Sequence, residues 1–286
     1  MVATLMDGAA LAARIRAELG DEVAELGEIG LATILVGEDP ASQIYIRLKH
    51  EAAEAAGIRA VDKRLPEETS QEELEASVLE LNEDDSIDGI LVQTPLPPHI
   101  DEPRVMRTID PMKDVDGLHP LNAGQLYFGS PTLAPATPVG IMRLLEEYGV
   151  QISGARAVVV GRSLIVGRPV AMLLLHENAT VTICHSRTED LARQTLDADI
   201  LVAAVGQAGV ISPDMVKAGS AVVDVGMNRT EAGLVGDVDP GAAERAAFIT
   251  PVPGGVGPMT IAMLLQNTLR AARFRRRLLA FPSVRG

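Results

Sequence analysis

The 286-residue sequence predicts an α/β fold with two domains and parallel-rich sheets. Short runs of valine, isoleucine and leucine alternate with alanine- and glutamate-rich helical stretches along most of the chain. This alternation is typical of parallel sheets whose strands are joined by helices. One run leads into a glycine-spaced turn, AVVVGRSLIVGRPV at 157–170, as in the phosphate-binding turns of dinucleotide sites. The second domain is therefore expected to be a Rossmann-type dinucleotide-binding domain.

Each expected element has a local signal. The strands are aliphatic or β-branched segments at 31–36, 58–65, 88–93, 157–160, 180–183, 199–205, 221–226 and 248–250. Asp7 is expected to open an N-terminal amphipathic helix. A second helix is expected from Ser42 to Gly57, where glycine suits the C-terminal cap, and a third begins at the capping box Ser70–Glu73.

A loop-rich region between about 94 and 137 interrupts this rhythm with proline, aspartate and glycine. Such long loops inside a compact α/β protein are more often functional than idle. We place the domain boundary there, with a catalytic domain at 1–121 and a nucleotide-binding domain at 122–286. The last helical pattern, 258–279, follows the last strand of the second domain. This helix is a candidate to lead the chain back into the first domain.

Composition excludes several classes of protein. A net charge of −14 argues against binding to nucleic acid, and no apolar run approaches the roughly 18 residues that a membrane span needs. The single cysteine, Cys184, rules out an internal disulfide and fits the cytoplasm. The basic cluster at 270–277 is expected to be the solvated end of the last helix, with a polyanion-binding tail as the alternative.

The turn at 161–169 departs from the usual glycine fingerprint. Gly161 and Gly167 lie six positions apart, and Arg162 and Ser163 stand where a second glycine is usual. Pro169 fits the first helical turn, where backbone N–H groups can face a pyrophosphate. Arg162 and Ser163 can also supply donors from their side chains. An ordinary strand-to-helix turn is the alternative.

The next strand bears on the choice of cofactor. In NAD-binding units an acidic residue often lies about 20 positions after the fingerprint and binds the ribose 2′-hydroxyl. Here the strand TVTI runs into CHSRT, which supplies Ser186 and Arg187 and no acid. With Arg162 in the same unit, this neighbourhood favours the 2′-phosphate of NADP.

Tyr45 and Lys49 lie four residues apart in SQIYIRLK, on one face of the expected helix. They form either an active-site pair or part of an ordinary surface helix with a snorkelling lysine. Y-x-x-x-K also occurs in short-chain dehydrogenases, but there it follows the nucleotide-binding turn. Here it precedes that turn by more than a hundred residues, which argues against that class.

Three further segments carry candidate site residues. Gln93 ends the strand DGILVQ, at the edge where parallel sheets bind ligands. It is either a ligand-binding residue or simply a polar residue at the end of a strand. Asp114 and Asp116 in KDVDG lack the further ligands of a metal site, so no metal is expected. Asp116 is instead suited to hydrogen-bond the amidine-like edge of a ligand ring. The alternative is that both aspartates are ordinary turn residues. The stretch 249–259, ITPVPGGVGPM, forms either a rigid loop with exposed backbone donors or a plain turn.

Together these segments resemble the bifunctional methylenetetrahydrofolate dehydrogenase/cyclohydrolase family over nearly the whole chain. The matching segments, in order, are YIRLK, DGILVQ with PLP, KDVDG, VVGRS with IVGRP, CHSRT, DVGMNR and ITPVPGGVGPMT. Two positions depart from the family pattern. Thr94 replaces a usual leucine, and Ala136 stands where a P-C-T-P segment is common.

The resemblance implies two reactions of one-carbon metabolism, and thus of purine biosynthesis, in a folate cleft between the domains. A hydride passes from 5,10-methylenetetrahydrofolate to NADP⁺, and water then opens the methenyl product to 10-formyltetrahydrofolate. Lys49 would be the main catalytic group, held by Gln93. Tyr45 would stack on the folate, and Asp116 would bind the pterin edge.

The resemblance also implies the remaining contacts and a homodimer mediated by the nucleotide domain. The folate site would be lined by Val92, Thr94, Pro253, Gly254, Gly255, Val256 and Gly257. The cofactor would be held by Gly161, Arg162, Ser163, Ser186 and Met227. Two alternatives differ in class: another two-domain NADP oxidoreductase of the shikimate- or amino-acid-dehydrogenase type, and a non-catalytic NADP sensor.

Overall fold

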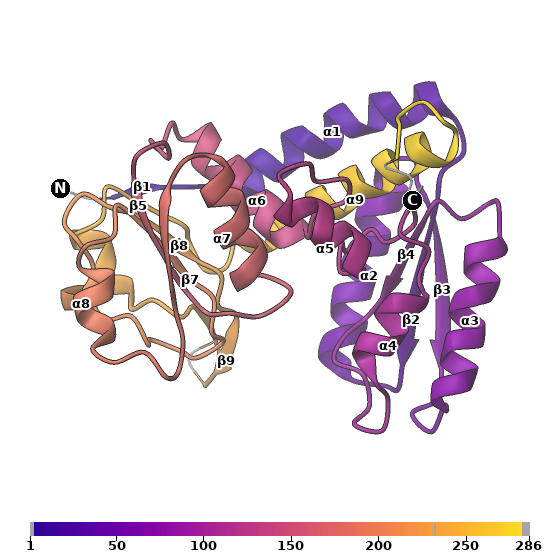
Figure 1. Ribbon diagram of the computed structural model, residues 1–286, viewed down its shortest axis with the longest axis horizontal. Coiled ribbons are helices and arrows are strands. Elements are labelled where there is room, and N and C mark those ends of the chain that lie inside the picture. Colours follow the sequence, from indigo (N-terminus) through magenta and orange to yellow (C-terminus); the bar gives the residue numbers. More distant parts are fainter. Residues whose placement is uncertain (1–2, 232, 282–286) are drawn as a thin grey trace. The chain divides into compact units, whose positions relative to one another are not determined.

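The computed structural model describes residues 3–231 and 233–281 (Figure 1). The chain divides into two compact units. The first unit comprises Met1–Ala12 and Thr137–Thr260, and the second comprises Ala13–Ala136 and Ile261–Gly286. Two helices, α1 (Gly8–Leu26) and α9 (Val256–Arg275), begin in the first unit and continue in the second. The two-domain α/β architecture with parallel sheets is confirmed.

A three-stranded parallel sheet forms the centre of the second unit. Its strands lie in the order β3 (Arg59–Leu65), β2 (Gly30–Val36) and β4 (Gly89–Val92). The unit's shorter helices are α2 (Pro40–Ala55), α3 (Gln71–Glu83), α4 (Glu102–Thr108) and α5 (Pro120–Tyr127). Alternate residues of β2 and β4 pack with α3 and α4 in one apolar cluster that includes Ile34 and Val92. The residue before Ile34 on β2, Thr33, instead bonds His50 of α2, so α2 covers the opposite face.

The helix ends expected from the sequence are present. Asp7 accepts a hydrogen bond from the amide of Ala10 (3.0 Å) at the start of α1. The Ser70 and Glu73 side chains each accept from the other residue's backbone N–H, which completes the capping box of α3. Gly57 follows α2 with φ +79°, a conformation that glycine adopts without steric cost.

The first unit contains a six-stranded sheet in which every neighbouring pair is parallel. Its order is β1 (Thr4–Leu5), β11 (Phe248–Ile249), β8 (Ala221–Asp224), β7 (Ile200–Ala203), β5 (Arg156–Val160) and β6 (Thr180–Cys184). Without β1, and counted from β5 along the chain, this is the doubly wound order 2-1-3-4-5. The order reverses between β5 and β7, which is where such sheets bind ligands.

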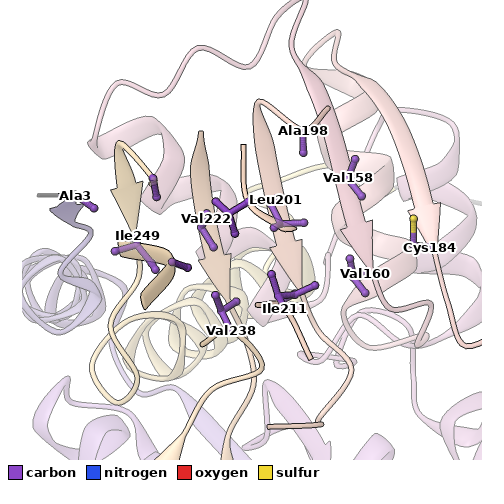
Figure 2. Close-up of a cluster of buried hydrophobic side chains, with 14 residues drawn as sticks. Ala3, Val158, Val160, Cys184, Ala198, Leu201, Ile211, Val222, Val238 and Ile249 are labelled. Carbon is purple, nitrogen blue, oxygen red and sulfur yellow. The ribbon is translucent and has the colours of Figure 1, made fainter. Parts of the chain in front are cut away.

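Buried side chains from five strands form one core of this unit (Figure 2). Val158, Leu201, Val222 and Ile249 lie on the same face of the sheet, and Cys184 lies among them. The remaining elements are α6 (Ala136–Glu147), α7 (Gly167–His176), α8 (Leu191–Thr195), the 3₁₀ turns η1 (Pro213–Met215) and η2 (Pro240–Glu244), and the hairpin β9 (Asn228–Thr230) and β10 (Gly233–Val235).

All eight expected strands are present, and five of them, expected at 58–65, 88–93, 199–205, 221–226 and 248–250, are one to three residues shorter than expected. The segments expected at 199–205 and 221–226 leave the sheet after Ala203 and Asp224, because the amides that follow bond to buried carboxylates. The two-residue strand β1 and the β9–β10 hairpin have no clear sequence signal. Among the described residues, no helix combines the length and the apolar character needed to span a membrane.

The expectation of a solvated basic end to the last helix is correct only in part: the segment ends α9 and Arg270 and Arg277 are exposed, but other arginines of the segment are bound to partners. Arg275 donates to Asp88 (2.7 Å) and to the carbonyl of Ile87 (2.8 Å), and its side chain is 15% exposed. Arg273 pairs with Glu22 of α1 (2.6 Å), and Arg276 donates to the carbonyl of Leu26. These three arginines therefore bind partners within the second unit, and they connect α9 to α1 and to the segment before β4.

Candidate active site and nucleotide site

Lys49 lies on α2, which begins where Asp39 accepts a hydrogen bond from the amide of Ser42 (2.7 Å). Pro40 occupies the first helical turn, where its missing N–H costs nothing. The half-buried Lys49 donates from Nζ to Oε1 of Gln93 at 3.0 Å. Tyr45 lies one turn earlier on the same helix and is also half-buried.

Gln93 lies immediately after β4, and its backbone amide donates to the carbonyl of Ile34 (2.9 Å). Its side-chain Nε2 donates to the carbonyl of Thr94 (2.7 Å). That second bond fixes the orientation of the side-chain amide, because the nitrogen is held by Thr94 and the oxygen is left to face Lys49. The structure therefore joins the predicted pair Lys49 and Gln93.

Lys49 and Asp116 also interact electrostatically. Burial lowers the pKa of Lys49 below its ordinary value, and the Asp116 carboxylate opposes that shift. Burial raises the pKa of Asp116, and Lys49 opposes that shift in turn. Each group thus favours the charged form of the other while burial favours both neutral forms, which makes this pair suited to managing a proton.

The KDVDG segment divides its charged residues between structure and site. Lys113 is 2% exposed and donates to the carbonyls of Leu81, Asn82 and Asp84, at the end of α3. No local pattern in the sequence indicates this cap, because the carbonyls that Lys113 binds lie 29 to 32 positions earlier in the chain.

Asp114 is also structural. It accepts from the amides of Leu118 (3.2 Å) and His119 (2.8 Å) and from Nδ2 of Asn122 (2.8 Å). Burial raises its pKa to about 6 despite these three donors. Asp114 thus holds the following loop, while Asp116 interacts electrostatically with Lys49. Within 3–231 and 233–281, no three His, Cys, Asp or Glu side chains are grouped as metal ligands.

The predicted folate-lining residues fall in both units. Val92 is 2% exposed and packs in the core of the second unit, so its side chain is not available to a ligand. Thr94 is half-buried beside Gln93. The loop Pro253–Gly257 belongs to the first unit, where Ala9 donates to the carbonyl of Gly254 (2.9 Å). A Cβ at Gly8 would lie 1.9 Å from the carbonyl oxygen of Gly255, so the start of α1 packs tightly against this loop.

The turn after β5 is built by its two glycines. Gly161 has φ +128°, and a Cβ there would lie 2.2 Å from the carbonyl oxygen of Ala204, at the switch point of the sheet. A Cβ at Gly167 would lie 2.3 Å from the carbonyl oxygen of Gly161. Bare backbone at both positions lets the start of α7 approach the end of β5 closely, as a dinucleotide turn requires.

Ser163 caps this turn. Its Oγ accepts from the amides of Val166 (3.1 Å) and Gly167 (3.3 Å), which occupies two donors that were expected to face a pyrophosphate. The hydroxyl hydrogen of Ser163 remains able to donate outward. Arg162 is exposed beside it. Side-chain donors at this turn therefore suit the phosphates of a dinucleotide.

The remaining nucleotide candidates lie on loops of the same unit. Ser186 and Arg187 are exposed after β6, and no acid occurs before Glu189. Met227 follows β8 and is 43% exposed. Gly161, Ser186 and Met227 thus follow the carboxyl ends of β5, β6 and β8, the edge of an open parallel sheet that binds ligands.

The fold and these sites define a two-domain α/β protein with a dinucleotide-binding sheet and a half-buried lysine held by a glutamine. Two family models match the chain: "Tetrahydrofolate dehydrogenase/cyclohydrolase, catalytic domain" over residues 6–116 and the NAD(P)-binding domain of the same family over residues 135–276. The chain belongs to the tetrahydrofolate dehydrogenase/cyclohydrolase family. The resemblance read from the sequence motifs is thereby confirmed.

Full-length relatives agree with this assignment. The chain is 56% identical over 279 residues to the bifunctional protein FolD of Moorella thermoacetica, covering 96% of this chain and all of the relative. The crystal structure of the bifunctional FolD enzyme of Campylobacter jejuni has a TM-score of 0.93 at 48% identity, covering 95% and 99% of the two chains. The Trypanosoma brucei enzyme, solved with NADP cofactor and inhibitor, has a TM-score of 0.92 at 46% identity, covering 98% and 100%.

Proposed function

We propose that the chain oxidises 5,10-methylenetetrahydrofolate with NADP⁺ and hydrolyses the resulting 5,10-methenyltetrahydrofolate to 10-formyltetrahydrofolate. The observation that carries this proposal is the 3.0 Å bond between Lys49 and Gln93, beside Asp116, in a chain of this family. Family membership and the near-complete match to bifunctional relatives confirm the two activities and the NADP cofactor expected from the sequence. The shikimate-type oxidoreductase and the sensor are not favoured.

In the first reaction the folate loses a hydride and becomes a cation. NADP⁺, when bound, accepts that hydride. No proton moves in this step, so the chain's task is to hold the folate and to tolerate its new positive charge. Lys49 suits this task because burial favours its neutral form, which does not repel the cation. We assign Asp116 to the pterin edge, Tyr45 to stacking on the folate, and Val92 (through its backbone), Thr94 and Pro253–Gly257 to the lining of its site.

In the second reaction water attacks the methenyl carbon, and a carbon–nitrogen bond then breaks. The attacking water must lose a proton, and the departing nitrogen must gain one. Neutral Lys49 can take the first proton and return one to the nitrogen, as a general base and then a general acid. Gln93 holds the ammonium and amine forms in the same place, because its Oε1 accepts from either.

For the cofactor, we assign Gly161, Arg162, Ser163, Ser186 and Met227 to binding NADP. The close approach at Gly161 and the outward hydroxyl hydrogen of Ser163 support a phosphate at the turn. The exposed cation at Arg162, together with the lack of an acid directly after β6, supports discrimination in favour of the 2′-phosphate.

We infer that the protein forms a homodimer through its first unit. Strand β6 ends the six-stranded sheet, and its residues Thr180, Thr182 and Ile183 are exposed. An edge strand of this kind has backbone donors and acceptors available to a second copy. The cytoplasmic location expected from the single cysteine stays a prediction.

The function is tested by one spectrophotometric assay. The purified protein is mixed with methylenetetrahydrofolate and NADP⁺, then with NAD⁺, while methenyl formation and its decay are recorded. We expect NADPH to form with methenyltetrahydrofolate, followed by decay faster than in buffer, and a lower rate with NAD⁺. NADP⁺ reduction with shikimate or an amino acid but not with the folate, or NADP binding without turnover, would contradict the proposal.

A further inference from the structure

Asp237 is a fully buried carboxylate that accepts four hydrogen bonds. Its Oδ2 accepts from the amides of Val205 (2.7 Å) and Gly206 (3.0 Å). Its Oδ1 accepts from the amide of Gln207 (2.9 Å) and from Nδ2 of Asn228 (2.9 Å). One carboxylate thus joins the loop after β7 to Asn228, the first residue of β9, where the loop after β8 ends.

Both loops lie at the edge of the sheet that carries the nucleotide candidates. The loop after β7 begins at Ala204, whose carbonyl approaches Gly161 so closely that no Cβ fits there. The loop after β8 contains Met227, the neighbour of Asn228. Asp237 itself lies behind these loops and is not exposed, so it has no access to a bound dinucleotide.

The loop after β7 owes its conformation to this carboxylate. Three successive amides, at 205, 206 and 207, turn inward to the same anion, an arrangement that backbone N–H groups adopt around anions. As a result, the side chains of Val205 and Gln207 are exposed. Without an acceptor, the three inward-turned amides would lose their shared hydrogen-bond partner, which is unfavourable.

A second buried carboxylate fixes Asp237 in turn. Asp224, the last residue of β8, accepts from the amides of Asp237 (2.8 Å), Val238 (3.0 Å) and Gly226 (3.0 Å). A Cβ at Gly226 would lie 2.2 Å from Oδ1 of Asp237, so the loop after β8 passes directly over the carboxylate. The position of Asp237 is therefore set by the backbone on both sides of it.

We propose that Asp237 is a positioning residue of the NADP site, which holds the loops after β7 and β8 in the conformation that binds the dinucleotide. It acts through Val205–Gln207 and through Asn228, and it touches neither the cofactor nor the reacting atoms. This inference rests on the proposed function, because it takes NADP as the ligand of this edge of the sheet.

The first test compares Asp237→Asn with Asp239→Asn. The asparagine at 237 keeps the shape but replaces one acceptor oxygen with an NH₂ group, which faces the loop amides. We expect its dissociation constant and KM for NADP⁺ to rise about ten- to a hundredfold, with kcat at saturating NADP⁺ within about threefold of wild type. Asp239 is exposed and caps η2 through Gly241 (2.8 Å), so Asp239→Asn is a matched control that should bind NADP⁺ as the wild type does.

A second measurement reports on the loops without any ligand. In the unliganded protein, hydrogen exchange of the amides at 205, 206 and 207 should be faster in Asp237→Asn and unchanged in Asp239→Asn. Asn228→Ala removes only the bond between Asp237 and the loop after β8. It should raise the dissociation constant for NADP⁺ by a smaller factor, about three- to tenfold, and it decides the question if Asp237→Asn does not fold.

The possible results distinguish failure of the positioning role of Asp237 from failure of the proposed function. Wild-type affinity for NADP⁺ in Asp237→Asn, or in Asn228→Ala if the former does not fold, would overturn the positioning role. A fall in kcat with unchanged NADP⁺ affinity would overturn it as well. Failure of the wild-type protein itself to bind NADP⁺ would refute the proposed function and this inference together.

Discussion

Lys49 donates to Oε1 of Gln93 at 3.0 Å, while the other end of the same glutamine side chain is held by the carbonyl of Thr94 at 2.7 Å. The glutamine therefore presents only its oxygen to the lysine. A neutral lysine still has an N–H for this bond and keeps its lone pair for a proton from water. The contact holds the amine in place without fixing its protonation state, which is what a group that takes and returns a proton requires.

The Lys49–Asp116 interaction predicts a shift in the pH dependence of the cyclohydrolase reaction. In the proposed mechanism Lys49 acts as a base in its neutral form, so kcat should rise with pH through the pKa of Lys49. The Asp116 carboxylate raises that pKa, so Asp116→Asn should move the rise in kcat to lower pH. The measurement is the pH profile of kcat at saturating methenyltetrahydrofolate, after subtraction of the buffer-catalysed rate.

Gln93→Glu should shift the pKa of Lys49 in the opposite direction to Asp116→Asn. It places a carboxylate against Nζ, so the pKa of Lys49 should rise and the profile should move to higher pH. Folate binding should also weaken in Asp116→Asn, because we propose Asp116 as the partner of the pterin edge. Profiles that stay in place in both variants would show that another group is titrating.

The NADP preference predicts a cofactor-specific effect at Arg162. Arg162→Ala should raise the KM for NADP⁺ about ten- to a hundredfold, because a charge-assisted bond to the 2′-phosphate is worth roughly 1.5–3 kcal/mol. The KM for NAD⁺ should change little. Arg143→Ala on α6, whose side chain pairs with Glu146, is the control for loss of an exposed cation in the same unit. Equal increases for both cofactors would remove Arg162 from this role.

Lys113 predicts a large effect on stability. Its ammonium satisfies three carbonyls at the end of α3, and Lys113→Met would leave them without that partner. We expect the free energy of unfolding to fall by about 3 kcal/mol, measured by urea denaturation. Lys63→Met removes an exposed pair with Glu80, so it should change the free energy by less than about 1 kcal/mol. Similar losses in both variants would show that the cap contributes little.

The sequence predicted much of the fold because its signals are local. The capping box at Ser70, the positive φ of Gly57 and the alternation of strands with helices depend on a few neighbouring residues each. The ion pairs of Arg273 and Arg275 were not anticipated because their partners, Glu22 and Asp88, are far away in the chain. Nothing in the cluster of arginines itself indicates that acids from distant segments will lie beside it.

In the candidate site, too, contacts between residues far apart in the chain could not be predicted from local sequence. The pairing of Lys49 with Gln93, 44 positions apart, was anticipated from the resemblance to a family, and no local pattern predicts it. In KDVDG the two aspartates look alike in sequence, and only the folded chain shows that Lys113 caps a helix and that Asp114 holds a loop. Asp237 was missed because its partners lie 9 to 32 positions away on two other loops.

The measurement that tests the central claim most directly follows methenyltetrahydrofolate in the Lys49→Gln variant. Glutamine can still help to hold the folate, but it cannot take and return a proton. We expect measurable dehydrogenase activity with cyclohydrolase activity reduced by about 10²–10⁴. With methylenetetrahydrofolate and NADP⁺, the methenyl compound should accumulate and then decay at the buffer-catalysed rate, while Lys63→Gln should behave as wild type. If dehydrogenase activity falls as far as cyclohydrolase activity, Lys49 only binds the substrate, and the proposed division of its roles is wrong.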